Sequence, residues 1–190
     1  NACIPCCVAE KLDLSNNALT GYLPLRLLYS LSNLKELNLR STQLYGPLPN
    51  EIGWLTNLVT LKISNSSFVG TLPTEIGHLS QLESLQLPRN QIAGPLPSEL
   101  GNLQRLTDLE LQYNSFSGQV PTEIGLLTSL VTMDYDGNFF SGEIPNDVCE
   151  LWNHDLTRSS NATDCSVAYG GLTCPSPACC PDLFCPSNLF

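Results

Sequence analysis

The sequence predicts an α/β solenoid in which six short parallel strands stack along one face and short helices line the opposite side. Three observations predict it: leucines with a period of 24 residues, glycine and proline columns in the same register, and cysteines confined to the two ends. Repeats of this length cannot bury an apolar face alone, so they stack into one continuous core closed by caps. We therefore expect a partial N-terminal cap at residues 1–8, six repeats over 9–148 and a cysteine-rich cap at 149–190.

The columns of the repeat extend over most of the chain. Leucine recurs every 24 residues at Leu34, Leu58, Leu82, Leu106 and Leu130. Each copy follows the pattern L-x-x-L-x-L-x-x-N-x-L-x-G-x-L-P-x-E-I-G, as in LESLQLPRNQIAGPLPSELG at residues 82–101. The glycine column consists of Gly21, Gly46, Gly70, Gly94, Gly118 and Gly142. The proline column consists of Pro24, Pro49, Pro73, Pro97, Pro121 and Pro145.

Each part of the repeat predicts an element. The L-x-L segment is expected to form a short strand, with the leucines pointing inward and the intervening residues outward. A column of small polar residues follows, and these side chains can satisfy backbone groups where the chain turns. This asparagine column consists of Asn17, Thr42, Ser66, Asn90, Asn114 and Asn138. After the proline, a polar residue and an acid, such as Thr74 and Glu75, indicate an N-cap and the first turn of a short helix.

The G-x-L-P segment between the expected strand and the expected helix indicates which class of repeat protein the sequence resembles. It resembles the plant-type leucine-rich repeats of receptor-kinase ectodomains and polygalacturonase-inhibiting proteins, and the resemblance covers residues 9–148. The resemblance implies a right-handed horseshoe with parallel strands on the concave face and helices on the convex side. It also implies an extracellular protein, secreted or located at the cell surface or in the cell wall, that recognises a ligand on its concave face.

Composition excludes several classes of partner. The net charge is −10 and the isoelectric point is about 4.4, which argues against binding to nucleic acid or to anionic lipid. No segment approaches the roughly 20 consecutive apolar residues that a membrane-spanning helix needs. We expect no nucleic-acid partner and no membrane span in this chain.

The cysteines predict disulfide-stapled caps in an oxidising compartment. Six of them lie at the C-terminal end, namely Cys149, Cys165, Cys174, Cys179, Cys180 and Cys185. Three bridges are expected among them, and the sequence leaves all 15 connectivities open. A zinc site is the competing interpretation, but paired C-x-x-C knuckles are missing. This cap resembles those of algal leucine-rich repeat proteins. The N-terminal end has an odd number of cysteines, Cys3, Cys6 and Cys7, so one thiol has no partner among them. This predicts a lost upstream partner or a disulfide link to another chain.

The stretch TMDYDGN, residues 132–138, looks at first like part of a calcium loop. The repeat register instead places Asp134 and Asp136 on the outward side of the sixth strand. Glu110 shares a column with Asp134, so the two residues should lie about 4.8 Å apart on adjacent strands. Ordinary solvation, a binding patch and a weak metal site are the alternatives for this cluster, and we predict no metal. The candidate ligand-binding residues are Asp108, Glu110, Tyr113, Asp134 and Asp136.

Two further features concern modification and catalysis. N-glycosylation sequons begin at Asn65 and Asn161. The two histidines, His78 and His154, belong to no recognisable catalytic motif, and no phosphate-binding loop or nucleophile elbow is present. We therefore expect a protein that is not an enzyme and that uses no cofactor.

Two functional hypotheses from different classes remain. The first is a recognition module, a receptor-like ectodomain or secreted inhibitor, that binds a protein, peptide or glycan through its concave face. A basic ligand would complement the acidic patch. The alternative is a structural or adhesive component of an extracellular assembly with no soluble ligand, in which self-assembly or a disulfide link to another chain matters more.

Overall fold

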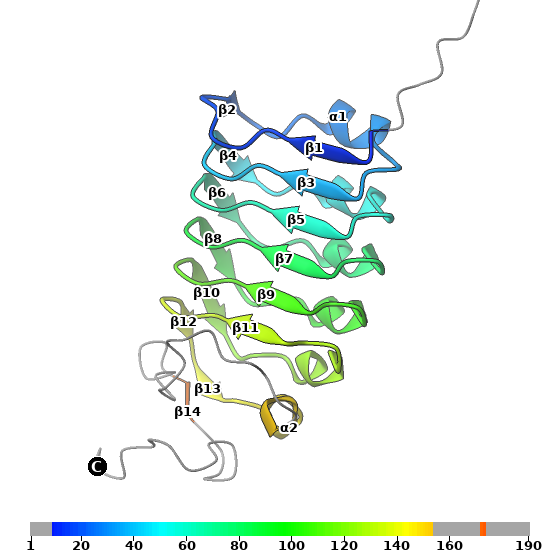
Figure 1. Ribbon diagram of the computed structural model, residues 1–190. Coiled ribbons are helices and arrows are strands. Elements are labelled where there is room, and N and C mark those ends of the chain that lie inside the picture. Colours follow the sequence, from blue (N-terminus) through cyan, green and yellow to red (C-terminus); the bar gives the residue numbers. More distant parts are fainter. Residues whose placement is uncertain (1–8, 154–171, 174–190) are drawn as a thin grey trace, which may run out of the picture.

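Residues 9–153 and 172–173 are described in a computed structural model, in which the repeats stack as a solenoid (Figure 1). The first sheet has six parallel strands in sequence order, which confirms the predicted strand face. These strands are β1 (Lys11–Asp13), β3 (Glu36–Asn38), β5 (Thr60–Lys62), β7 (Ser84–Gln86), β9 (Asp108–Glu110) and β11 (Thr132–Asp134). Equivalent positions of successive repeats face one another, as in the pairing of Leu61 with Leu85. The outward side of this sheet is called the concave face below.

A second parallel sheet lies beyond the turn that follows each strand, and the sequence did not predict it. Its strands are β2 (Thr20–Gly21), β4 (Gln43–Pro47), β6 (Ser67–Gly70), β8 (Gln91–Gly94), β10 (Ser115–Gly118) and β12 (Phe139–Phe140). At the C-terminal end, β13 (Gly142–Glu143) pairs in parallel with β14 (Leu172–Thr173). Each repeat therefore contributes one strand to each of the two sheets.

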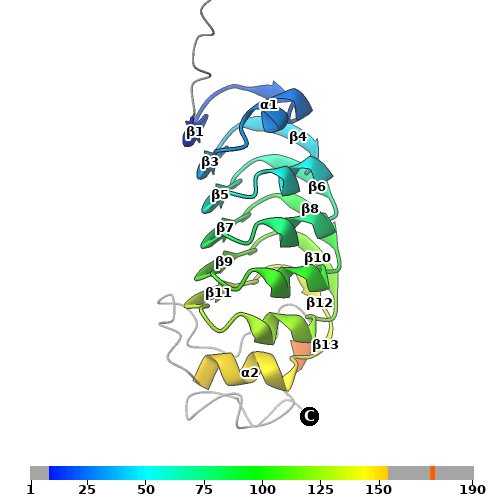
Figure 2. The same cartoon turned by 90° about the vertical axis from the view of Figure 1, so that its right-hand side faces the viewer.

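Helices close each repeat on the side between the two sheets, where they stack in one column (Figure 2). The α-helices are α1 (Leu25–Ser30) and α2 (Asn146–Asn153). The 3₁₀-helices are η1 (Asn50–Trp54), η2 (Thr74–His78), η3 (Ser98–Asn102) and η4 (Thr122–Leu126). The predicted acid does occupy the first turn of each 3₁₀-helix, as Glu75 does in η2.

The predicted polar N-cap is wrong. The residue at the cap of η2 is Pro73, in an extended conformation, and it makes no side-chain capping bond. The hydroxyl of Thr74 instead donates to the carboxylate of Glu75 at 3.3 Å. Proline presets the extended entry into the helix, so the residue after it is already inside the first turn.

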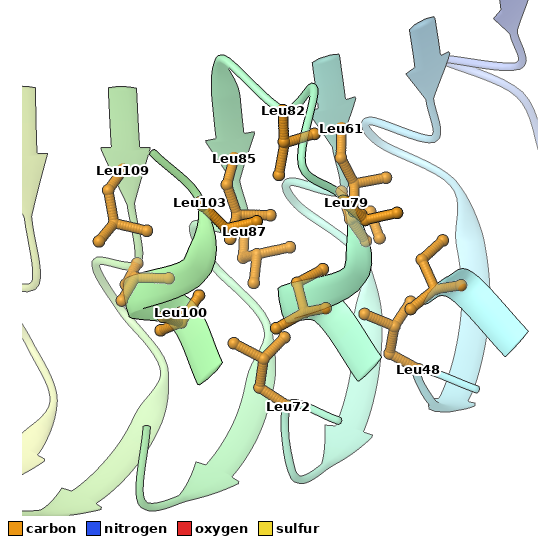
Figure 3. Packing of buried hydrophobic residues seen from close by; sticks show 14 of the residues in the cluster. Leu48, Leu61, Leu72, Leu79, Leu82, Leu85, Leu87, Leu100, Leu103 and Leu109 are labelled. Atoms are coloured by element: carbon orange, nitrogen blue, oxygen red, sulfur yellow. The ribbon is translucent and has the colours of Figure 1, made fainter. Parts of the chain in front are cut away.

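Leucine, isoleucine and phenylalanine side chains from the strands and helices form one core that runs the length of the stack. Figure 3 shows the leucines of part of this core. Leu61, Leu85 and Leu109 from the first sheet are completely buried. Each such side chain stabilises the fold by roughly 1.5–3 kcal/mol through burial. In the sixth repeat the inward positions hold Met133 and Tyr135, which are only partly buried against the core.

The asparagine column forms the predicted ladder between repeats. Asn114 donates from its amide nitrogen to the carbonyls of Leu87 at 2.9 Å and Leu111 at 3.0 Å, and its oxygen accepts the backbone N–H of Ile92 at 3.1 Å. Asn90 and Asn138 make the same three kinds of bond. Thr42 and Ser66 replace the amide with hydroxyls that bond to each other at 3.2 Å and to the carbonyl of Leu39.

Candidate functional site

The structure brings the five predicted ligand-binding residues to the C-terminal half of the concave face. Asp108 and Glu110 lie in β9, Asp134 lies in β11, and Tyr113 and Asp136 follow these strands. Asp134 is the direct register partner of Glu110, and Thr132 is the partner of Asp108. The expected placement of these two residues side by side on adjacent strands is therefore confirmed. These five residues are called the acidic patch below.

Asp108 differs from the other acids because neighbouring strands satisfy its carboxylate. One oxygen accepts hydrogen bonds from the hydroxyl of Ser84 and the amide of Gln86, both at 2.8 Å. The other oxygen accepts a short bond from the hydroxyl of Thr132. Asp108 thus ties three strands of the first sheet together, so its role is partly structural. The sequence alone did not indicate this network.

The electrostatic repulsion within the acidic patch is concentrated at Glu110 and Asp134. Partial burial is the main cause that raises the pKa of Glu110, and the charges of Asp108 and Asp134 raise it further. Burial also raises the pKa of Asp134, and this is opposed by the backbone N–H of Asp136, which donates to its carboxylate at 3.1 Å. Like charges placed directly opposite each other on adjacent strands destabilise a sheet. A positively charged ligand group at this place would relieve that repulsion.

Tyr113 borders the acidic patch at the edge of the sheet. Its ring is half exposed, and the guanidinium carbon of Arg89 lies 4.6 Å from the ring centroid in a cation–π contact. On its other side the ring lies against Gly137, where an added Cβ would come within 2.7 Å of it. Arg89, Tyr113 and Gly137 all occupy the position before the asparagine column, with positive φ angles. The sequence signal for this stack is that the three residues share one column of the repeat. The signal is visible only when the repeats are compared with one another.

The N-terminal end of the concave face has a different electrostatic character. Lys11 and Glu36, partners on adjacent strands, form an ion pair of 3.0 Å. The backbone N–H of Ser15 donates to Asp13 at 2.9 Å, and hydrogen bonding to Ser15 lowers the pKa of that carboxyl. Acids here have local partners, whereas Glu110 and Asp134 face each other.

No group of three or more metal-ligating side chains within residues 9–153 and 172–173 is arranged to hold a metal ion. In TMDYDGN, Asp134 lies within β11 and Asn138 belongs to the hydrogen-bonded asparagine column. The segment is thus a strand of the repeat followed by its turn.

Some predicted features fall outside the described residues. Cys149 lies in α2, whereas the other five C-terminal cysteines and the three N-terminal ones lie outside, as does Asn161. The other sequon asparagine, Asn65, is exposed at the turn after β5 and has a positive φ of 54°. Both glycosylation sites and all the disulfides remain predictions.

The stacked strands, asparagine ladder and short helices define a solenoid protein with an exposed strand face. A family model for the leucine-rich repeat region matches residues 5–118, and the chain belongs to this family. No curated protein matches the sequence at a significant level. No helix in the described part of the chain is long and apolar enough to cross a membrane.

Similar solved structures are ectodomains of plant receptors. The peptide hormone receptor RGFR1, solved in complex with RGF2, is 30% identical, with a TM-score of 0.73 over 75% of this chain and 23% of its own. The Arabidopsis receptor kinase HAESA, solved with the peptide hormone IDA and the co-receptor SERK1, is 36% identical, with a TM-score of 0.73 over 78% of this chain and 24% of its own.

A shorter similar structure comes from the Arabidopsis thaliana complex of BIR3 and SERK2. It is 35% identical, with a TM-score of 0.62 over 69% of either chain. The present chain therefore spans about a quarter of the first two receptor ectodomains but about two thirds of this one. These similarities show that the chain shares the leucine-rich repeat architecture of plant receptors.

Proposed function

We propose that this chain is an extracellular recognition module that binds a basic peptide or protein segment at the acidic patch of its concave face. The observation that carries the proposal is the placement of Glu110 opposite Asp134 on adjacent strands. Partial burial raises the pKa of both carboxyls, so their charged forms are held at an energetic cost that a cationic ligand group would offset.

Tyr113 supplies a complementary feature. It is an exposed aromatic residue with a polar tip, a type enriched at binding hot spots. Its cation–π contact with Arg89 demonstrates that a guanidinium group can occupy one face of the ring. A peptide that places Lys or Arg beside the two carboxylates would pair charges there, while a neighbouring part of the peptide packs against the exposed part of the Tyr113 ring. A neutral glycan would leave the repulsion between Glu110 and Asp134 in place.

The comparison with receptors supports a peptide as the class of ligand. RGFR1 was solved with RGF2 and HAESA with the peptide hormone IDA, and both share the repeat architecture of this chain. An extracellular location at the cell surface or in the cell wall is part of the same proposal. The competing proposal, a structural or adhesive component, is favoured by the uneven number of N-terminal cysteines.

The test replaces Glu110 by Gln and both Asp134 and Asp136 by Asn. A matched control changes Glu75, Glu99 and Glu123 to Gln on the helix side, so that the net charge changes equally. A random peptide library is selected on each immobilised protein, and the recovered peptides are compared by their Lys and Arg content. Binding of a recovered peptide is then measured at low and high salt, together with thermal unfolding.

The wild type and the control are expected to enrich basic peptides, and salt should weaken their binding by screening. The variant with Glu110, Asp134 and Asp136 replaced should lose affinity by about tenfold or more, which corresponds to about 1.4 kcal/mol. Its stability should stay the same or rise. Equal enrichment by all three proteins would contradict the proposal and favour the structural alternative.

A further inference from the structure

A second exposed surface covers the outer side of the second sheet. It consists of the outward positions one, three and five residues after each member of the asparagine column, and is called the lateral face. All of these positions are exposed or partly exposed, whereas the side chains two residues after the column, such as Phe68 and Ile92, are buried in every repeat but the first, where Leu19 is exposed. Figure 1 shows the strands β2 to β12 stacked one above the other along this side of the molecule.

Charge is excluded from the lateral face. The chain carries 8 basic and 18 acidic residues, yet Glu143, at the C-terminal end, is the one charged residue among the eighteen positions of this face. Charged residues make up 14% of the whole chain, so about two or three would be expected among eighteen positions. Nine of the eighteen are Ser, Thr or Gln, such as Gln43, Gln91 and Ser117, whose side chains end in a hydroxyl or a carboxamide group.

The lateral face is also smooth between repeats. The side chain of Thr71 lies over Gly94 of the next repeat, where an added Cβ would be 3.0 Å from its Cγ2 atom. Tyr22 lies over Gly46 in the same way, and a Cβ there would overlap its ring. The glycine column thus removes the ridges that side chains would form between successive strands.

Exposed aromatic residues stand at both ends of this face. Tyr22 and Tyr45 form an edge-to-face pair with ring centroids 5.0 Å apart, and they are 66% and 44% exposed. Phe139 at the other end is 67% exposed. A shallow pocket of about 620 Å³ adjoins this C-terminal end, and its lining includes Gln119 and Glu143.

We propose that the lateral face binds a neutral polysaccharide in an extended conformation, with the sugar chain running across the strands along the stack. Sugar hydroxyls need neutral donors and acceptors, which the hydroxyl and amide side chains supply. The C–H faces of sugar rings pack on aromatic rings, which the tyrosine pair and Phe139 supply. Strands repeat about every 4.8 Å, close to the length of one sugar unit in an extended β-1,4-linked chain.

A neutral polymer fits the lateral face better than a protein does. Protein interfaces are enriched in Arg, Met and aromatic anchors around an apolar centre. The lateral face has no Arg or Met, its aromatic residues stand at the two ends, and its centre holds Ser67, Gln91 and Ala93. A second copy would bring two molecules of net charge −10 together without compensating ion pairs. A repeating ligand also gains from engaging equivalent positions of several repeats at once.

The test measures sedimentation of the full chain with amorphous cellulose and binding to soluble xylan and mannan as neutral β-1,4-linked polymers. Polygalacturonate serves as the acidic comparison. One variant removes the rings (Tyr22→Ala with Tyr45→Ala), and a second adds charge without changing shape (Gln43→Glu with Gln91→Glu). The matched control for the second is Asn33→Asp with Asn102→Asp, which changes the same net charge at exposed positions outside the lateral face. Thermal unfolding confirms that each variant is folded.

The wild type should bind at least one neutral polymer with little dependence on salt and should not bind polygalacturonate. Both lateral variants should lose affinity by about tenfold, equivalent to about 1.4 kcal/mol, and the control should bind as the wild type does. Absence of binding to every neutral polymer, or binding that both lateral variants retain, would overturn the proposal. Sedimentation velocity that shows a dimer abolished by the lateral variants would also overturn it, because the face would then belong to a second copy.

Discussion

Asn114 illustrates how one side chain joins successive repeats at the residue scale. It is buried and satisfies the carbonyls of Leu87 and Leu111 and the backbone N–H of Ile92. Its replacement by Ala would leave the N–H of Ile92 buried and unpaired, whereas the carbonyls of Leu87 and Leu111 would each keep one bond, from Asn90 and Asn138. The sequence predicted this role correctly, because a small polar residue recurs directly after the strand in every repeat, where backbone groups need partners.

We predict that Asn114→Ala lowers the free energy of unfolding by about 1–3 kcal/mol, the cost of one buried polar group left unpaired. Urea denaturation measures this change. Asn102→Ala, at an exposed position in η3, is the control and should stay within about 0.5 kcal/mol of the wild type. A loss at Asn114 no larger than at Asn102 would show that water replaces the amide.

The raised pKa values of Glu110 and Asp134 predict a pH effect of definite sign. Because each folded-state pKa lies above its unfolded value, the folded protein binds more protons in the interval between them. The free energy of unfolding contributed by this pair therefore falls as pH rises from the ordinary carboxyl range through the raised pKa values. The cost of charging the two carboxyls, which comes mainly from their partial burial, is fully present at neutral pH and is relieved by acid.

The variant Glu110→Gln with Asp134→Asn should therefore be more stable than the wild type at neutral pH. Its advantage should shrink as the pH falls through the raised pKa values. Urea denaturation of both proteins at a series of pH values measures the difference. A difference that is constant over the whole series would mean that neither carboxyl titrates abnormally.

At the scale of elements, the 3₁₀-helices stack more closely than side chains would allow. An added Cβ on Gly77 would lie 2.5 Å from the backbone oxygen of Glu99, and the same relation holds for Gly101 and Glu123 at 2.6 Å. Because the obstacle is backbone rather than a flexible side chain, neighbouring repeats would have to separate. The E-I-G segment of the repeat is thereby explained by helix packing.

Gly77→Ala is expected to destabilise the protein by about 1–3 kcal/mol through overpacking. Thermal or urea unfolding tests this, with Ser98→Ala in η3 as an exposed control expected within about 0.5 kcal/mol of the wild type. An unchanged stability of the Gly77 variant would show that the helix column has room to move.

The sequence predicted the first sheet, the asparagine ladder and the acid in each first helical turn, but it did not predict the second sheet. The strands of the second sheet are two to five residues long and all except β12 contain glycine, as Ser67–Gly70 does, so local propensity favours a turn. They form because stacking aligns them. For the site, the column register placed Glu110 beside Asp134, whereas the hydrogen bonds of Asp108 depend on side-chain lengths across three strands.

At the scale of the whole molecule, the three sides of the solenoid differ in chemistry. The concave face has ion pairs at one end and the acidic patch at the other, the helix side carries the acids of the first turns, and the lateral face is almost free of charge. A stack of repeats can present such separate surfaces because each column of the repeat extends along one side. The two proposed ligands would therefore bind without competing.

The most direct test of the central claim, recognition at the acidic patch, is photo-crosslinking from aromatic positions of similar exposure. A benzophenone amino acid replaces Tyr113 on the concave face, which is 53% exposed, or Trp54 on the helix side, which is 52% exposed. Each protein is irradiated with extracellular extract from the native source, and the adducts are identified by mass spectrometry. We predict a peptide or protein adduct rich in Lys or Arg from position 113 and none from position 54. Adducts from position 54 alone would contradict the account, because they would place the partner on the helix side.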